Sequence, residues 1–285
     1  MIMEIANSVV LVTGANGGMG RAFVADLLKR GAAKIYIAAR DTTTLSALLA
    51  DGGSHLVPLQ LDVTRADQVV AAARIATDAT LLINNAGIST FEGAIAASDM
   101  DPARLEMEVN YFGMLAMTRA FAPILAAAGG GTVVNMLSML SLVSLPRAAT
   151  YSASKAAGLS LTRSIRAELG AQGTRVIGVL AVQTETAMGA KMPEPRMTPQ
   201  ELVSDVLDAV QAGTNDEIVA GAQSRSVYQS FVDDPKAVQA MMSTRLPQQA
   251  DAFLSQPTEE SWTISVPSCA VTMSSPTTAS IPIGE

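Results

Sequence analysis

A glycine-rich turn lies between an apolar strand and an amphipathic helix near the start of the chain, and it constrains the fold more than any other feature. Residues 8–12 are too few for a helix and suit a strand that is buried on both faces. The turn at 13–20 follows at once, and apolar residues then recur at helical spacing until Gly31 ends the helix. Such a turn would let a pyrophosphate approach the backbone at the helix N-terminus. A tight turn without a ligand is the alternative, but three glycines exceed what a turn needs.

Further apolar runs predict strands that alternate with helices along the chain. Asp101 and Pro102 are expected to begin a long helix that runs through Ala128, and Thr64 is expected to cap an alanine-rich helix. The alternation predicts an α/β fold of the Rossmann type, a doubly wound parallel sheet of about seven strands with helices on both faces. The later strands are expected at 34–39, 56–61, 80–83, 132–137, 175–180 and 217–220.

Composition excludes several classes of function. The 285 residues carry 19 basic and 26 acidic side chains, so the net charge of 19 − 26 = −7 argues against nucleic acid or an anionic membrane as a partner. The chain lacks an apolar run of roughly 18 residues, and its first residues do not resemble a signal peptide, so a cytoplasmic location is expected. One cysteine (Cys269) and one histidine (His55) make zinc chemistry and Ser/His or Cys/His catalysis improbable, and no metal site is expected.

The end of the second predicted strand bears on the choice of cofactor. Arg40 stands about twenty residues past the last glycine of the turn, where a dinucleotide fold reads the adenosine ribose. An acidic residue there would hold a 2′-hydroxyl, whereas Ala39 followed by Arg40 leaves room and positive charge for a 2′-phosphate. The sequence therefore favours NADP(H) over NAD(H), although Asp41 weakens the argument. A solvated arginine at a strand end is the alternative.

A tyrosine and a lysine at helical spacing form the candidate catalytic pair. If Tyr151 opens a helix, Lys155 projects from the same face one turn later, and its charge is expected to lower the pKa of the phenol. Ser138, at the end of a predicted strand, would supply a second hydroxyl to an oxygen on which charge changes. A solvated Tyr/Lys pair is the alternative. Asn110 falls inside an apolar helix and needs a partner, either the backbone or an ordered water.

These motifs together resemble the short-chain dehydrogenase/reductase family, in its shorter single-domain branch. The resemblance covers about residues 7–220. The glycine motif alone fits the longer epimerase/dehydratase branch as well, but chain length and Asn-Asn-Ala-Gly at 84–87 favour the shorter one. The motifs in chain order are Thr-Gly-x-x-x-Gly-x-Gly at 13–20, Asn-Asn-Ala-Gly, Asn110, Ser138 and Tyr151-x-x-x-Lys155.

The resemblance implies a role for each motif residue. Tyr151 would exchange the proton, Lys155 would hold the nicotinamide ribose, Ser138 would position a carbonyl, and Asn110 would tie a water to the lysine. Asp62 and Val63 would meet the adenine ring. The residues expected to bind NADP(H) are Gly14, Asn16, Gly18, Met19, Gly20, Arg40, Asp62, Val63, Asn84, Ala86, Gly87, Tyr151, Lys155, Thr184 and Thr186.

The chain departs from the family pattern after the sixth predicted strand. The family has a Pro-Gly pair beside the nicotinamide, and Ala181 and Val182 stand here instead. Valine does not take the positive-φ conformations of glycine cheaply, so either strain or a changed backbone path is expected.

The expected activity is transfer of hydride between NADP(H) and an alcohol/ketone pair, on an apolar small-molecule substrate, in a homodimer or homotetramer. A non-catalytic NADP-sensing module and a nucleotide-sugar epimerase or dehydratase are the alternatives. The pocket would be lined by Leu140, Leu142, Val143, Leu145, Met188, Met192 and Met197, which could equally fill core and loops.

The expected domain organisation is one catalytic domain and a tail. Residues 1–245 would form the dinucleotide-binding domain, with a substrate lid at about 186–200 and a break in the last helical region at Asp234-Pro235. Half of the last thirty residues are Ser, Thr or Pro, so 246–285 is expected to be a flexible tail, with Trp262 either an anchor or an exposed aromatic residue.

Overall fold

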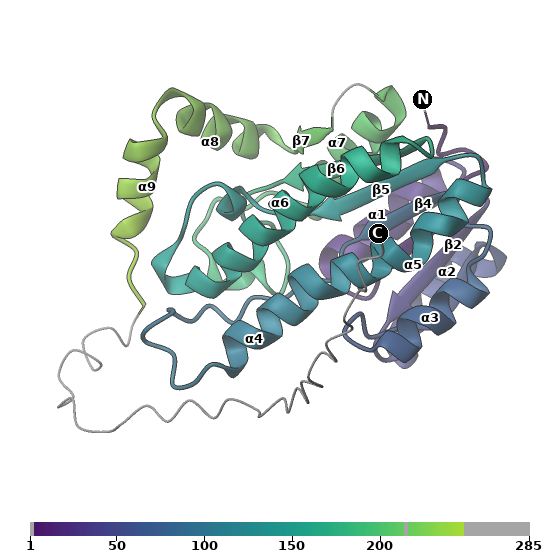
Figure 1. Cartoon of the computed structure of the whole chain (residues 1–285), viewed down its shortest axis with the longest axis horizontal. Helices are drawn as coiled ribbons and strands as arrows, with labels where there is room; N and C mark the ends of the chain where they lie inside the picture. The colour runs from purple at the N-terminus through teal and green to yellow at the C-terminus, as the bar shows by residue number, and fades with distance from the viewer. Residues whose placement is uncertain (1–2, 214–215, 248–285) are drawn as a thin grey trace, which may run out of the picture.

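One seven-stranded sheet organises the protein, and all its strands are parallel (Figure 1). The computed structural model describes residues 3–213 and 216–247. The strand order is β3-β2-β1-β4-β5-β6-β7, so the winding reverses between β1 and β4, where the carboxyl ends of strands form a crevice in folds of this type. The strands are β1 (Val9–Thr13), β2 (Lys34–Ala39), β3 (Leu56–Gln60), β4 (Leu81–Asn84), β5 (Gly131–Met136), β6 (Thr174–Leu180) and β7 (Glu217–Val219).

Helices cover both faces of the sheet, as the alternation of strands and helices predicted. Along β1, Val10 and Val12 pack into one core layer, and Leu11 between them packs into the other. α1 and α7 contribute to the first layer, and α3, α5 and α6 contribute to the second, which is nearer the viewer in Figure 1. The α-helices are α1 (Gly18–Lys29), α2 (Ser46–Gly52), α3 (Ala66–Ile75), α4 (Asp101–Met107), α5 (Met114–Ala127), α6 (Ala149–Gly170), α7 (Pro199–Ala212), α8 (Ala222–Asp233) and α9 (Pro235–Ser243).

The long helix expected after Asp101 is present but changes its winding midway. α4 and α5 are joined by a π-helical stretch, Glu108–Gly113, in which the backbone turns are wider. Asn110 lies within this stretch and is buried.

α8 and α9 extend away from the β7 edge of the sheet and are separated by the predicted break (Figure 1). Gln239 of α9 donates to the carbonyl of Ser144 (3.0 Å) and accepts from its N–H (2.8 Å). This contact anchors α9 to the segment after β5. The predicted tail beyond residue 247, including Trp262 and Cys269, lies outside the described residues. None of the helices in the described ranges has the length and apolar character that a membrane span requires.

Candidate active site

The glycine-rich turn and the segment after β4 are joined at the carboxyl end of β1. The hydroxyl of Thr13 accepts from the N–H groups of Asn85 (3.0 Å) and Ala86 (2.9 Å), and the Asn85 amide donates to the carbonyls of Thr13 and Gly14. Gly14 has a φ of +63°, and a Cβ there would lie 3.1 Å from the Cα of Ala86. The turn needs glycine here because its backbone passes so close to the next segment.

The start of α1 lies close to the segment that follows β6. A Cβ on Gly18 would lie 3.0 Å from the Cγ2 of Thr186, so the predicted lid begins directly over this helix N-terminus. Gly20 lets α1 pack against its own turn, because a Cβ there would be 2.2 Å from the carbonyl oxygen of Gly14. Asn16 and Met19 are half-buried in the same turn. These placements suit the cofactor roles proposed for the turn.

Arg40 is exposed and lies directly after β2, and its contact with the adenosine ribose stays a prediction. The carboxylate of Asp41 accepts from both the N–H and the hydroxyl of Thr43, and these hydrogen bonds hold its pKa below the ordinary value. The Asp41 carboxylate therefore stabilises the turn at Thr43. Arg21, which the sequence did not single out, donates to the carbonyls of Asn16 (2.9 Å) and Thr44 (3.2 Å) and so adds a second positive charge nearby.

Two residues expected at the adenine ring have clear partners within the protein. Asp62 accepts from the N–H and the hydroxyl of Thr64. The prediction that Thr64 caps the next helix is wrong: α3 begins at Ala66, and its N-cap position is Arg65. Val63 is buried, and a Cβ on Gly113 would lie 2.6 Å from its Cγ2, so Val63 faces the π-helical stretch.

The side chain of Asn84, one of the residues predicted to bind the cofactor, points into the core. It is buried and donates to Asn135 (2.8 Å) and Thr118 (3.2 Å), which joins β4 to β5 and α5. The sequence predicted that Asn84 binds the cofactor, as the first residue of a segment suited to a close approach to the cofactor or a neighbouring strand. The Asn84 amide points into the core instead, since the side chains of a strand alternate between faces.

Tyr151, Ser138 and Lys155 lie together as the sequence predicts. Tyr151 is in the first turn of α6, and the hydroxyl of Ser138, just after β5, is hydrogen-bonded to its phenol. The Nζ of Lys155 is 5.7 Å from the centroid of the tyrosine ring and donates to the carbonyl of Met136 (2.8 Å). The alternative interpretation, a solvated Tyr/Lys pair, is wrong, since Lys155 is only 6% exposed.

Burial controls the protonation of this pair. It raises the pKa of Tyr151 to about 12, although the hydrogen bond from Ser138 lowers it and the negative charge of Glu106 raises it further. Burial also lowers the pKa of Lys155 to about 8. The expectation that the lysine lowers the pKa of the tyrosine below its ordinary value is therefore not met, because desolvation raises the pKa by more than the hydrogen bond from Ser138 lowers it.

Asn110 has the backbone partner that its burial requires. Its amide accepts from the N–H of Ile88 (2.9 Å) and donates to the carbonyl of the same residue (2.9 Å) and to the hydroxyl of Ser154 (2.9 Å). A Cβ on Gly87 would lie 3.1 Å from the Asn110 Oδ1 and 3.4 Å from the Lys155 Nζ. Gly87 thus lets the segment after β4 pass close to Asn110 and Lys155.

Ala181 and Val182 stand where the family has Pro-Gly, and the backbone there is unstrained. Among the described non-glycine residues, only Asn7 and Phe91 have a positive φ. The N–H of Val182 donates to the hydroxyl of Ser224 (3.1 Å), and the valine packs beside Leu142 in a small apolar cluster. The sequence predicted either a strained backbone or a changed backbone path at this pair, and strain is excluded.

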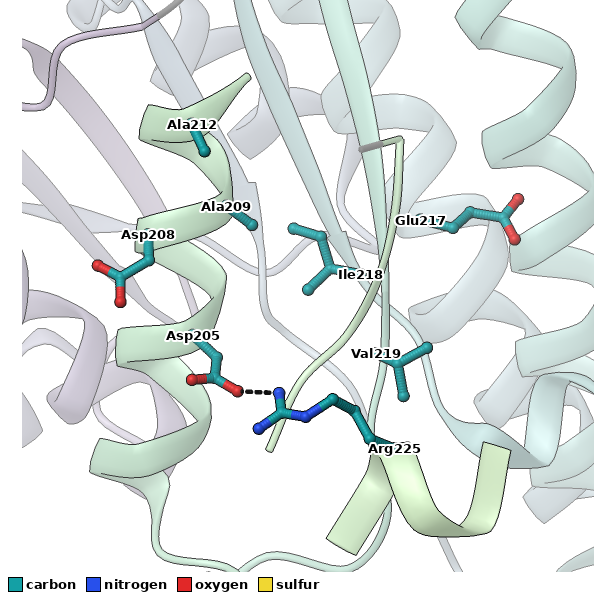
Figure 2. A pocket seen from close by; sticks show the side chains of 8 residues that line it. All are labelled: Asp205, Asp208, Ala209, Ala212, Glu217, Ile218, Val219 and Arg225. Carbon is teal, nitrogen blue, oxygen red and sulfur yellow. Dashed lines mark hydrogen bonds and ion pairs between the residues drawn. The ribbon is translucent and has the colours of Figure 1, made fainter. Parts of the chain in front are cut away.

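The start of α8 is held in place from α7. The carboxylate of Asp205 accepts from the N–H of Gly221 (2.7 Å) and from the guanidinium of Arg225 (2.6 Å). Figure 2 shows this ion pair in a surface pocket between α7, β7 and α8. None of the predicted catalytic or cofactor residues lines this pocket, so it is separate from the active site.

The residues predicted to line the substrate pocket differ in burial. Val143, Leu145 and Met197 are buried in the core, and Met197 packs against Ser224 and Gly221. Their alternative reading as core residues is therefore confirmed. The other four are half-buried, and their role in lining a substrate pocket stays a prediction: Leu140, Leu142, Met188 and Met192. Thr184 is also buried, and it pairs with Met197 across the base of the lid.

The parallel sheet, with Tyr151, Ser138 and Lys155 together at the carboxyl ends of its strands, is a Rossmann-type arrangement. A family model for short chain dehydrogenase matches residues 8–196, and the chain belongs to this family of oxidoreductases. The family assignment that these motifs predicted is therefore confirmed.

Known relatives support the same conclusion. A short chain dehydrogenase from Burkholderia cenocepacia J2315, solved in complex with NADP, is 43% identical, covers 84% of this chain and 99% of its own, and has a TM-score of 0.79. Galactitol 2-dehydrogenase (L-tagatose-forming) of Cereibacter sphaeroides is 32% identical over 78% of this chain and 88% of its own. Dehydrogenase/reductase SDR family member 7B of Mus musculus is 31% identical over 79% and 77%.

Proposed function

We propose that this protein is an NADP(H)-dependent oxidoreductase that interconverts a ketone or aldehyde and its alcohol on an apolar small molecule. The observation that carries the proposal is the half-buried Tyr151, whose phenol is hydrogen-bonded to Ser138 and which lies one helical turn from the buried Lys155. An acidic group with a second hydroxyl beside it is what protonation of a carbonyl oxygen requires.

The protonation states favour carbonyl reduction near neutral pH. Because burial holds the pKa of Tyr151 at about 12, the phenol keeps its proton and acts as the acid. Ser138 would donate to the same carbonyl oxygen. With a pKa of about 8, Lys155 is mostly charged at pH 7, and its charge stabilises the phenolate that remains. The nicotinamide supplies the hydride when it is bound.

The residues present fit a dinucleotide phosphate. The ammonium of Lys155 can make three hydrogen bonds; one is made to Met136, and the others are suited to ribose hydroxyls. Gly18 and Thr186 would border the pyrophosphate at the start of α1. Arg40 would bind the 2′-phosphate, and the NADP complex of the 43% identical Burkholderia protein supports this choice.

One assay tests the proposal. Oxidation of NADPH and of NADH is followed against a panel of ketones, aldehydes and quinones, with Tyr151→Phe as the control protein. We expect turnover with NADPH that the variant lacks. Binding of NADPH without turnover on any carbonyl would favour the sensing module, and equal use of NADH would contradict the role of Arg40.

We further propose a homodimer or homotetramer that takes no nucleic acid or membrane partner. Leu105 and Phe112, on the helical segment that carries Asn110, are 51% and 48% exposed, which favours burial of this surface between subunits. Light scattering of the purified protein would test this, and a monomer at micromolar concentration would contradict it.

A further inference from the structure

A buried carboxylate lies next to the catalytic group, and the proposed chemistry does not use it. Glu106 of α4 is fully buried, and none of the ion pairs within the described residues includes it. Burial of a carboxylate is expensive unless hydrogen bonds compensate for the lost water. The position therefore needs an explanation from its contacts.

Each oxygen of Glu106 binds a different segment. Oε1 accepts from both the N–H (2.8 Å) and the hydroxyl (3.0 Å) of Thr90, which lies in the segment after β4. Oε2 accepts from the hydroxyl of Thr150 (2.5 Å), the residue directly before Tyr151 in α6. All three partners are donors, which suits an ionised carboxylate.

Glu106 and Asn110 make parallel connections between the same two segments. Asn110 follows one turn later and joins Ile88 to Ser154, and Ser154 is likewise one turn after Thr150. Two side chains, spaced four residues apart on one helix, thus each link the segment after β4 to a residue of α6. Tyr151 lies between the two points where α6 is held.

We propose that Glu106 is a positioning residue for Tyr151, which holds the first turn of α6 against the segment after β4 as Asn110 holds the second. This inference rests on the proposed function. Two charged groups of the described residues then lie near the phenol: the ammonium of Lys155, four residues further along α6, and the carboxylate of Glu106 on α4. Because the carboxylate favours the neutral phenol, its removal should let Tyr151 ionise at lower pH.

Three single variants test the inference. Glu106→Gln keeps the size of the side chain but removes its charge and one acceptor, and Thr150→Val removes the donor on α6. Glu108→Gln is the matched control, because Glu108 is exposed on the same helical segment two residues away. For each we would measure kcat, KM for the carbonyl, NADPH affinity and the pH dependence of turnover.

We expect kcat of Glu106→Gln and Thr150→Val to fall roughly tenfold to a hundredfold, the range for a displaced catalytic group, with NADPH affinity close to that of the wild type. The pH profile of Glu106→Gln should also move to lower pH, which loss of packing alone would not cause. Glu108→Gln should match the wild type. Wild-type kcat and an unchanged pH profile in both test variants would overturn the proposal, as would a loss of kcat with no shift in the profile of Glu106→Gln.

A measurement without substrate separates this inference from the proposed function. The ionisation of Tyr151 is read from phenolate absorbance, as the difference between each protein and its Tyr151→Phe form, and amide exchange is followed over residues 86–92 and 149–156. Glu106→Gln should ionise at lower pH and exchange faster in both segments. If the wild type reduces no carbonyl, the proposed function fails. The inference fails separately if Tyr151 of Glu106→Gln ionises at the same pH as in the wild type and the two segments exchange at the wild-type rate.

Discussion

Replacing Val182 by glycine should destabilise the protein, although it restores half of the family's Pro-Gly pair. The valine has an ordinary backbone conformation, so glycine relieves no strain. It is half-buried in the cluster with Leu142 and residues of α8. Full burial of a valine contributes about 1.5–3 kcal/mol, so partial burial contributes about 1 kcal/mol. The greater freedom of glycine in the unfolded chain adds about 0.5–1 kcal/mol. The sum, about 1.5–2 kcal/mol, corresponds to a fall in Tm of roughly 3–8 °C.

Thermal and urea unfolding of Val182→Gly, Val182→Ala and Ala181→Pro would measure these contributions separately. The alanine variant should show the loss of packing without the added backbone freedom. Fluorescence titration with NADPH should show affinity that is unchanged or weaker in Val182→Gly. A glycine variant that is more stable than the wild type and binds NADPH more tightly would refute the reasoning, because it would reveal strain that the backbone geometry does not show.

Four other substitutions test the site. Tyr151→Phe should lower turnover by at least about a hundredfold with intact NADPH binding, because it removes the proton donor; activity within tenfold of the wild type would reject that role. Arg40→Ala should weaken NADPH by about tenfold to a hundredfold and NADH far less in binding titrations, since only NADPH carries the 2′-phosphate; equal effects would exclude this contact. Ser224→Ala should lower the free energy of unfolding by about 1–3 kcal/mol, because the N–H of Val182 loses its acceptor. Ser226→Ala is the control, since Ser226 is exposed, and it should leave this free energy unchanged. Equal melting temperatures of the two variants would contradict the prediction. Lys155→Met should abolish turnover and yet stabilise the fold at neutral pH.

The sequence was sufficient for the order of the elements and for the proximity of the candidate catalytic residues. Strand–turn–helix alternation is a local pattern, and Tyr151 and Lys155 share a helix face by spacing alone. Asn84 shows what local reasoning does not reach, because the partners of its side chain, Asn135 and Thr118, come from elements far along the chain. A motif indicates that a residue is needed but does not show which way its side chain points.

Glu106 shows a second limit of the sequence. In the chain it is one acidic residue among several at the start of a helix, and its spacing to Asn110 gives no sign of burial. Only the packing of α4 against α6 and against the segment after β4 shows that its two oxygens meet Thr90 and Thr150. The pKa of Tyr151 was mispredicted for the same reason, since desolvation depends on the surrounding fold and not on the neighbour one helical turn away.

The stabilising effect expected of Lys155→Met follows from the same burial. The pKa of Lys155 is lowered from 10.5 to about 8, so the folded state binds its proton less tightly than the unfolded state does. At pH 7 this difference costs the folded protein about 3 kcal/mol at most. Methionine loses the hydrogen bond to Met136, which offsets about 1 kcal/mol, so a net gain of about 1–2 kcal/mol is expected.

The pH dependence gives the sharper test of this variant. The penalty is complete below pH 8, shrinks as pH rises, and is gone above the unfolded pKa of 10.5. Urea unfolding at pH 7 and at about pH 9.5 should therefore show a smaller gain at the higher pH, with exposed Lys191→Met unaffected at both. A destabilised Lys155→Met with no pH dependence would mean that the cation is accommodated without cost. If the gain is found, the protein retains an unfavourable buried charge beside Tyr151, as expected where catalysis and stability make opposite demands on one side chain.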